Sequence, residues 1–112
     1  HGGVFEVSRA SDAVLAAGHQ ALADFLGADD AGCIAFGANM TTITFTVSRA
    51  LARTWKKGDE VVVTKLDHEG NVGPWVQAAK DAGATVKTVE VNVEDGTLKQ
   101  DSYRAALSPK TK

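Results

Sequence analysis

The fold is decided by the stretch Glu60-Val-Val-Val-Thr-Lys-Leu-Asp-His-Glu-Gly-Asn-Val-Gly-Pro-Trp75. Its unbroken valines predict a strand over residues 60–65 that is buried on both faces, as in a parallel sheet. The polar residues that follow predict a turn. Pro74 is typical of the first turn of a helix, and Gly83 is placed to end that helix. A strand that leads into a helix is the unit from which α/β domains are built.

One imidazole, that of His68, comes just after this strand. Asp67, Glu69 and Asn71 surround it in the sequence. Ligands of α/β proteins bind in the loops beyond the carboxyl ends of parallel strands, so these side chains are candidates for a binding or catalytic site. An aspartate–histidine pair beside a helix start can equally be a local cap. The residues alone leave both interpretations open.

The residues before this strand predict two helices and a short strand. Ser11 can cap a first helix that Gly27 ends, with His19 on its exposed face. Residues 33–36 are typical of a short buried strand, in which Cys33 would be a small buried hydrophobe. A second helix is predicted over about 41–55. Its apolar face consists of Ile43, Val47, Ala50, Leu51 and Trp55.

The residues after the central strand complete an alternating pattern. Thr85–Val93 predicts a third strand, and a helix through Tyr103 should end before Pro109. The strands over 60–65 and 85–91 are joined by one helical crossover, so they should pair directly and in parallel. We therefore expect one α/β domain over residues 1–112, a three-layer α/β/α structure with a mainly parallel sheet.

Composition excludes several classes of function. A net charge of −2 without a basic stripe argues against nucleic acid and anionic membranes as partners. The chain has no apolar run long enough to span a bilayer and no signal-peptide pattern, and its single cysteine fits a reducing compartment, so we expect a cytoplasmic protein. The three histidines, His1, His19 and His68, are widely separated, and no metal site is predicted.

A second candidate site lies at Gly37-Ala-Asn-Met-Thr-Thr42. A glycine turn before a helix that opens with asparagine and threonines can bind an anion, because amides at a helix N-terminus point outward and the helix dipole adds positive potential. The same residues also suit an ordinary N-cap by Asn39 or Thr41. Neither the Rossmann fingerprint nor the P-loop motif is present.

The two candidate sites together resemble the class V aminotransferase and cysteine-desulfurase family of fold-type-I pyridoxal-phosphate enzymes. Three segments carry the resemblance: His1-Gly2-Gly3 with Phe5, the stretch Phe36-Gly-Ala-Asn-Met-Thr-Thr-Ile-Thr-Phe45, and Gly58–Val63 with Leu66–Trp75. The runs Gly83-Ala84-x-Val86 and Asp95-Gly96-Thr97 continue it. The resemblance covers essentially the whole chain and is nearest to the cysteine-desulfurase-like branch.

The resemblance implies a role for each candidate residue. Met40 and Thr41 would hold the phosphate of pyridoxal phosphate, and Asn39 would shape their turn. His68 would lie over the pyridine ring as the catalytic histidine and handle protons. Asn71 would lie in the wall of the site. The family also implies an amino-acid substrate and a homodimer.

Family members also need a lysine for the Schiff base and an aspartate beside the pyridinium nitrogen. The chain contains eight lysines, but none follows a histidine as in the family. We therefore expect part of a large domain, cut at both ends and inactive alone. In that arrangement the strand over 33–36 finds no partner within the chain, and 108–112 is a polar tail. The alternative is a free-standing, non-catalytic α/β module that binds a phosphorylated ligand or a partner protein.

Overall fold

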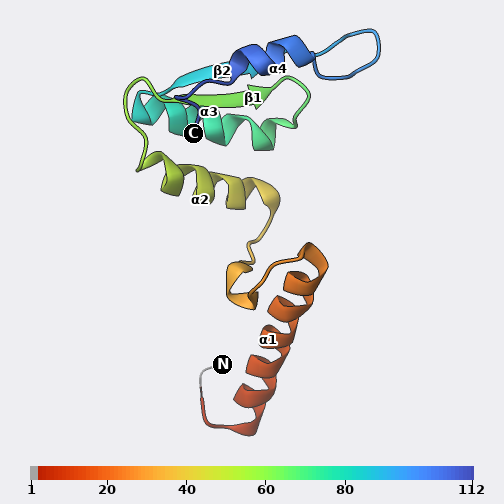
Figure 1. Ribbon diagram of the computed structural model, residues 1–112. Coiled ribbons are helices and arrows are strands. Elements are labelled where there is room, and N and C mark those ends of the chain that lie inside the picture. The colour runs from red at the N-terminus through yellow and green to blue at the C-terminus, as the bar shows by residue number, and fades with distance from the viewer. Residues whose placement is uncertain (1–2) are drawn as a thin grey trace. The chain divides into compact units, whose positions relative to one another are not determined.

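The computed structural model describes residues 3–112. They form two compact units, one up to Phe36 and the other from Gly37 to Lys112 (Figure 1). His1 and Gly2, which begin one of the family-like segments, lie outside the described residues. Within residues 3–112, no helix has both the length and the hydrophobicity needed to cross a bilayer.

The first unit contains a long helix, α1 (Glu6–Leu26), and a short 3-10 helix, η1 (Ala31–Cys33). α1 begins five residues before Ser11, so the predicted Ser11 cap is wrong. Gly27 does end the helix, with the left-handed φ of 69° that glycine tolerates best.

Three further predictions for this unit are corrected. Residues 33–36 form no strand: Cys33 belongs to the 3-10 turn in which the Asp30 carboxylate accepts a hydrogen bond from the Gly32 amide (2.8 Å), and residues 34–36 are irregular. Cys33 is exposed rather than buried. His19 is half-buried, and its ring meets the Phe36 ring edge-on at 4.7 Å between centroids.

The second unit is built around two parallel strands. Strand β1 (Glu60–Thr64) pairs directly with β2 (Thr85–Val89), with Glu60 opposite Thr85. The predicted direct parallel pairing is confirmed, although β2 ends four residues before Val93. Helix α3 (Gly73–Ala82) joins the strands, and Gly83 ends it at φ 70° as predicted.

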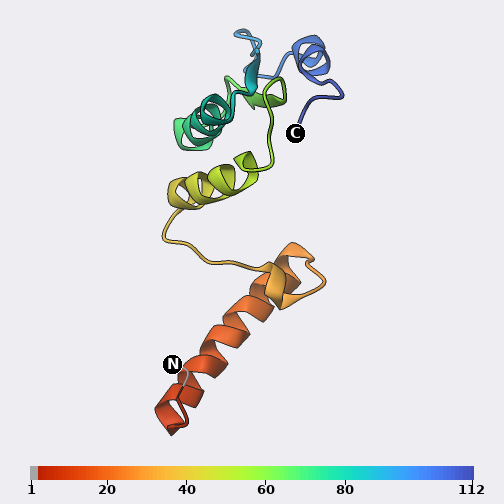
Figure 2. The same cartoon turned by 90° about the vertical axis from the view of Figure 1, so that its left-hand side faces the viewer.

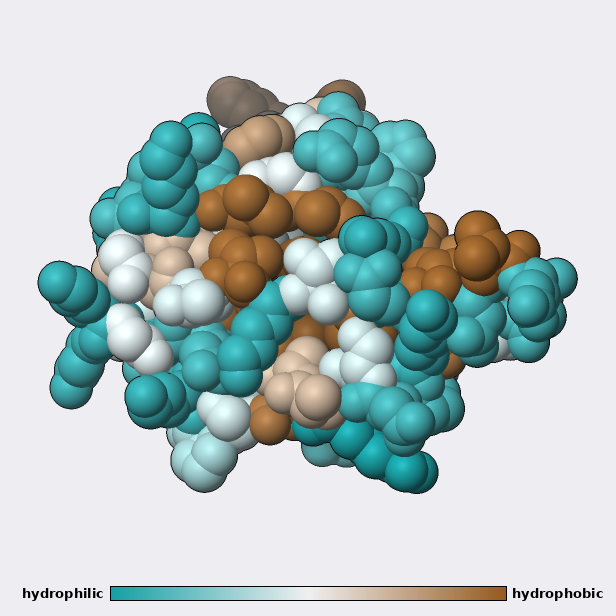
Figure 3. Space-filling view, turned by 90° about the horizontal axis from the view of Figure 1, so that it is seen from above, coloured by the Kyte–Doolittle hydropathy of each residue, from teal (hydrophilic) through white to brown (hydrophobic). Residues whose placement is uncertain are grey.

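Helices cover both faces of this sheet. α3 lies on one face, and α4 (Gln100–Ala106) packs against β2 on the other, which gives the predicted three-layer α/β/α order (Figures 1 and 2). Helix α2 (Met40–Ala52) packs beside α3, on the side away from α4. Seen from above, where α4 and the sheet lie, apolar side chains gather in the centre of the surface and polar ones surround them (Figure 3).

The core lies between β1 and α3. Val61 and Val63 are buried with Ala79, and Trp55 and Trp75 pack against them. Val62, on the opposite face of β1, is only half-buried. The prediction that β1 is buried on both faces therefore holds fully only for the face against α3, and the opposite face is half-buried.

α2 buries a different face from the one predicted. Ser48 is fully buried and Thr44 is 8% exposed, whereas Ile43, Val47 and Leu51 are 38%, 42% and 47% exposed. Small side chains let helices approach closely, and α3 presents buried alanines at this contact. α2 also ends at Ala52 rather than at Trp55.

The last five residues are more than a polar tail. Thr111 forms an isolated parallel bridge with Glu60, on the edge of β1 opposite β2. The Glu60 carboxylate accepts hydrogen bonds from Lys87 Nζ (2.7 Å) and Ser108 Oγ (2.6 Å). These bonds lower the pKa of Glu60 below its ordinary value, and the bond with Lys87 has the largest effect.

Candidate active site

The loop after β1 is fixed by a threonine–aspartate pair. Thr64 Oγ1 accepts hydrogen bonds from the amides of Leu66 (3.2 Å) and Asp67 (3.1 Å), and it donates one to Asp67 Oδ2 (2.5 Å). Such side-chain bonds to nearby amides are the usual way in which threonine and aspartate set a turn. The chain therefore leaves the sheet in a defined conformation just before His68.

His68 is the N-cap of a short 3-10 helix, η2 (Glu69–Asn71). Its Nδ1 atom accepts a hydrogen bond from the Gly70 amide at 3.0 Å. A neutral imidazole has one donor and one acceptor nitrogen, so the ring proton is on Nε2 when the ring is neutral. The residue is exposed rather than buried in the core. His68 therefore caps the short helix and keeps an accessible imidazole at the same time.

Asn71 is held by a chain of side-chain hydrogen bonds. Its Nδ2 donates to Asp67 Oδ1 (3.2 Å), and its Oδ1 accepts from Trp75 Nε1 (3.4 Å). Both polar atoms of the Asn71 amide are therefore engaged, although the residue is exposed. Asp67 binds Thr64 with one oxygen and Asn71 with the other, and so links the end of β1 to η2.

The start of α2 provides the second group of candidate residues. Asn39 is its N-cap, and its Oδ1 accepts a hydrogen bond from the Thr42 amide at 2.9 Å. Of the two capping residues considered, Asn39 is therefore the one used. Met40 and Thr41 are the first helical residues, whose amides have no acceptor within a helix. These two amides point outward at the positive end of the helix dipole.

The two groups meet at Gly70. A Cβ atom at this glycine would lie 2.7 Å from Thr41 Oγ1, 3.1 Å from His68 Nδ1 and 3.3 Å from Met40 Cε. The structure therefore brings Met40 and Thr41 against the loop that carries His68, although about thirty positions separate them in the chain. Asn39 precedes them directly, and Asn71 follows Gly70.

The sequence had not pointed to Asp67 as a link or to Gly70 as the point of closest approach. The Thr64-x-x-Asp67 spacing is a signal that predicts such a turn. No local signal identifies Gly70, because its neighbour Thr41 comes from another element. Within residues 3–112, no group of three or more histidine, cysteine, aspartate or glutamate side chains is arranged to hold a metal ion.

Comparison with known proteins decides the family. The family model described as aminotransferase class-V matches residues 1–112. The chain belongs to the class V aminotransferase family. Part of one relative, a cysteine desulfurase of Synechococcus elongatus, is 33% identical to this chain over 106 residues, which are 94% of the chain and 17% of the relative.

Two other similarities agree with this family. An uncharacterized protein of Mycobacterium tuberculosis is 36% identical over 110 residues, or 98% of this chain and 27% of that protein. A structure of C-DES with glycine covalently linked to the pyridoxal-phosphate cofactor superposes with a TM-score of 0.76 at 24% identity, over 99% of this chain and 29% of that one. This class V aminotransferase chain thus spans between 17% and 29% of the length of these proteins.

The comparisons confirm the resemblance on which the sequence interpretation was based, and with it the α/β fold of that family. The chain matches the N-terminal part of cysteine-desulfurase-like class V aminotransferases. None of these similarities supports the alternative of a free-standing, non-catalytic module.

Proposed function

We propose that residues 1–112 supply the phosphate-binding turn and the ring-stacking histidine of a pyridoxal-phosphate enzyme of the cysteine-desulfurase-like class V aminotransferases. In this proposal the chain is part of the cofactor-binding large domain. The observation that carries it is the contact at Gly70, where the start of α2 meets the His68 loop. A phosphate site and an imidazole on adjacent elements match the two ends of a phosphorylated aromatic cofactor.

The start of α2 has the donors that a phosphate needs. The amides of Met40 and Thr41 and the Thr41 hydroxyl can donate hydrogen bonds to phosphate oxygens, and the helix dipole favours the negative charge. Asn39 holds the turn through its bond to the Thr42 amide. Thr41 is exposed, so its hydroxyl is accessible to a ligand.

His68 has the properties of a stacking residue. Its Nδ1 is engaged by the Gly70 amide, which fixes the ring, while the residue is exposed. The bound cofactor would supply the electron sink for chemistry at the α-carbon of an amino acid. With Nδ1 accepting from the Gly70 amide, Nε2–H of the neutral ring can donate a hydrogen bond to a ligand. Asn71, fixed by Asp67 and Trp75, would form the wall beside His68.

The remaining parts of the proposal concern the complete protein. We propose an amino-acid substrate and a homodimer, as the family resemblance implies, and a cytoplasmic location, which the single cysteine favours. The Schiff-base lysine and the aspartate for the pyridinium nitrogen would come from outside residues 1–112, so these residues alone would not catalyse the reaction.

The test uses the complete protein that carries these residues and measures its affinity for pyridoxal phosphate by cofactor absorbance after equilibrium dialysis. Thr41→Ala should weaken cofactor binding about tenfold, because it removes a hydrogen bond to a charged group. Thr46→Ala is the matched control, since Thr46 is exposed on the same helix and bonds only to the Thr42 carbonyl. It should leave the affinity unchanged.

Two variants separate the roles of His68. His68→Phe retains an aromatic ring and should keep cofactor binding while lowering turnover, whereas His68→Ala should weaken both. His19→Phe changes the other described histidine and is the control. It should alter neither cofactor binding nor turnover. Wild-type affinity in both Thr41→Ala and His68→Ala would contradict the proposed site.

A further inference from the structure

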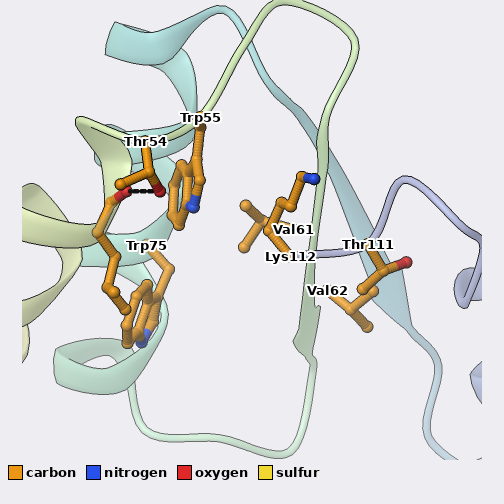
Figure 4. Close-up of a pocket in the computed structure, with 8 residues that line it drawn as sticks. Thr54, Trp55, Val61, Val62, Trp75, Thr111 and Lys112 are labelled. Carbon is orange, nitrogen blue, oxygen red and sulfur yellow. Dashed lines mark hydrogen bonds between the residues drawn. The ribbon is translucent and has the colours of Figure 1, made fainter.

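Two features outside the candidate active site differ in the chemistry that they offer. One is a cavity of about 420 Å³, with Trp55 and Trp75 on one side and Val61 facing them (Figure 4). Its lining is mainly apolar, so it offers packing surface rather than reactive groups. The other is the loop between β2 and α4, in which Asp95 lies directly before Gly96. This pair has a reaction of its own.

Asp95-Gly96 is the sole aspartate–glycine pair in the sequence, and no asparagine precedes a glycine. Both residues are exposed. Glycine has no side chain to hinder the approach of its nitrogen to the preceding carboxyl group. An aspartate before a glycine is therefore especially prone to spontaneous isomerisation, and this pair is where the unfolded chain should isomerise first.

The reaction sets conditions that a structure can meet or refuse. The Gly96 nitrogen attacks Cγ of Asp95, and a bond between them forms while the protonated carboxyl group and the amide together lose one water molecule. The resulting cyclic imide then takes up water. Opening at the side-chain carbonyl restores aspartate, and opening at the main-chain carbonyl leaves isoaspartate of the same mass. The attack needs a free amide nitrogen and a free, protonated carboxyl group.

The loop holds the nitrogen in a closed turn. The Gly96 amide donates a hydrogen bond to the Asn92 carbonyl, and the Asn92 amide donates to the Thr97 carbonyl, each at 2.8 Å. Val91 and Leu98 form an antiparallel bridge beside them. Gly96 has a φ of 71°, which glycine adopts without strain. The nitrogen must therefore leave its hydrogen bond before it can attack.

The loop also holds the carboxylate. Asp95 Oδ1 accepts hydrogen bonds from the Thr97 amide (2.9 Å) and from Thr97 Oγ1 (2.8 Å). Thr97 Oγ1 accepts in turn from Asn92 Nδ2 at 2.9 Å. The bonds from the Thr97 amide and hydroxyl, in that order, lower the pKa of Asp95, because they favour its ionised form. The carboxyl group is thus tied to residue 97 and kept in the form that does not lose water.

We propose that Asp95-Gly96 is a latent site of isoaspartate formation, and that its hydrogen bonds with Asn92 and Thr97 suppress the reaction while the loop is closed. Opening of the loop releases the nitrogen and the carboxyl group together, so the rate follows local opening. Isoaspartate adds one atom to the main chain between Asn92 and Thr97, and their backbone bond then no longer forms in the present geometry. The inference does not depend on the proposed function.

Ageing of the complete protein in neutral buffer tests the site. Peptide mapping by chromatography separates the isoaspartate and aspartate forms of the peptide that contains Asp95. The same protein in denaturant gives the unprotected rate. Isoaspartate at Asp95 should form about tenfold more slowly in the folded protein, or slower still, since one hydrogen bond to a charged group is already worth such a factor. Equal rates, or faster isomerisation of another aspartate in denaturant, would overturn the proposal.

Two substitutions at position 97 isolate the threonine hydroxyl. Thr97→Val removes its bond to Asp95 and should raise the rate of isomerisation in the folded protein about tenfold. Thr97→Ser keeps the hydroxyl, and Thr88→Val makes the valine change outside the loop, on β2. Both are controls and should isomerise at the wild-type rate. Exchange of the Gly96 amide reports whether Thr97→Val opens the loop. A wild-type rate in Thr97→Val overturns the role of Thr97, whether or not that amide stays protected.

Discussion

Gly70 lies so close to Thr41 that a Cβ atom at position 70 would stand 2.7 Å from Thr41 Oγ1. Gly70→Ala should therefore push η2 away from the start of α2 and lower the free energy of unfolding of the complete protein by about 1–3 kcal/mol. It should also weaken pyridoxal-phosphate binding, because the two halves of the proposed site separate. Urea unfolding and equilibrium dialysis measure the two effects.

Thr41→Ala in the Gly70→Ala background should recover part of the lost stability, since it removes the atom that clashes. It should not recover cofactor affinity, because the hydroxyl is lost as well. Gly18→Ala is the control: its nearest side-chain atom is 4.0 Å away, in Phe36, and alanine suits the interior of a helix. Equal stability of Gly70→Ala and Gly18→Ala would contradict the close contact between position 70 and Thr41.

Asp67 should couple energetically to Thr64. Asp67→Ala and Thr64→Val each break the bond between them and loosen the turn before His68. Because both remove the same interaction, their combined cost in unfolding free energy should be smaller than the sum, with a coupling of about 0.5–3 kcal/mol. A double-mutant cycle by urea unfolding measures this, and simple additivity would mean that Asp67 does not fix the turn.

Ser48 should not tolerate a large side chain. Ser48→Leu adds volume to the buried contact of α2 with α3 and should destabilise the complete protein by about 1–3 kcal/mol. Thr46→Leu makes a similar change on the exposed side of the same helix, and its effect should stay within about 0.5 kcal/mol. Denaturant midpoints measure both, and equal midpoints for wild type and Ser48→Leu would contradict the close contact of α2 with α3.

Glu60 should make stability depend on acidic pH. Its pKa is lowered in the folded state by Lys87 and Ser108, so the stabilisation is present above the ordinary glutamate pKa of about 4.3 and is lost as pH falls through the lower folded value. Wild type should therefore lose more stability than Glu60→Gln below that pH. Asp95, whose pKa is lowered by its bonds to Thr97, contributes the same trend in both proteins. Thermal midpoints between about pH 7 and pH 3 test this, and parallel curves would exclude the Glu60 contribution.

The sequence predicted best the elements whose signals are local. The valines of β1, the proline at the start of α3 and the glycine at its end identify a β-α-β unit whose pairing the structure confirms. The strand expected at 33–36 failed because a strand needs neighbours, and none is present beside it among the described residues. Cys33 instead ends the turn that Asp30 fixes, and residues 34–36 are irregular.

Helix α2 shows why periodicity can indicate the wrong contact. Its apolar residues define a face correctly, but in this chain α2 packs through Thr44 and Ser48, whose small size suits a close helix contact. For the site, the Asn39 cap was one of two anticipated options, and the exposure of His68 followed from its place after a strand. The proximity of Thr41 to Gly70 required the tertiary structure, because no local pattern encodes it.

The β-α-β unit over residues 60–89 has a consequence for how the molecule forms during synthesis. Its strands are separated by a single helix, so the chain closes only a short loop to pair them, and low sequence separation favours rapid folding. The loop that carries His68 lies inside this unit and is shaped by residues 64–75. We therefore expect that the imidazole is in position on the ribosome before any later segment has emerged to meet it.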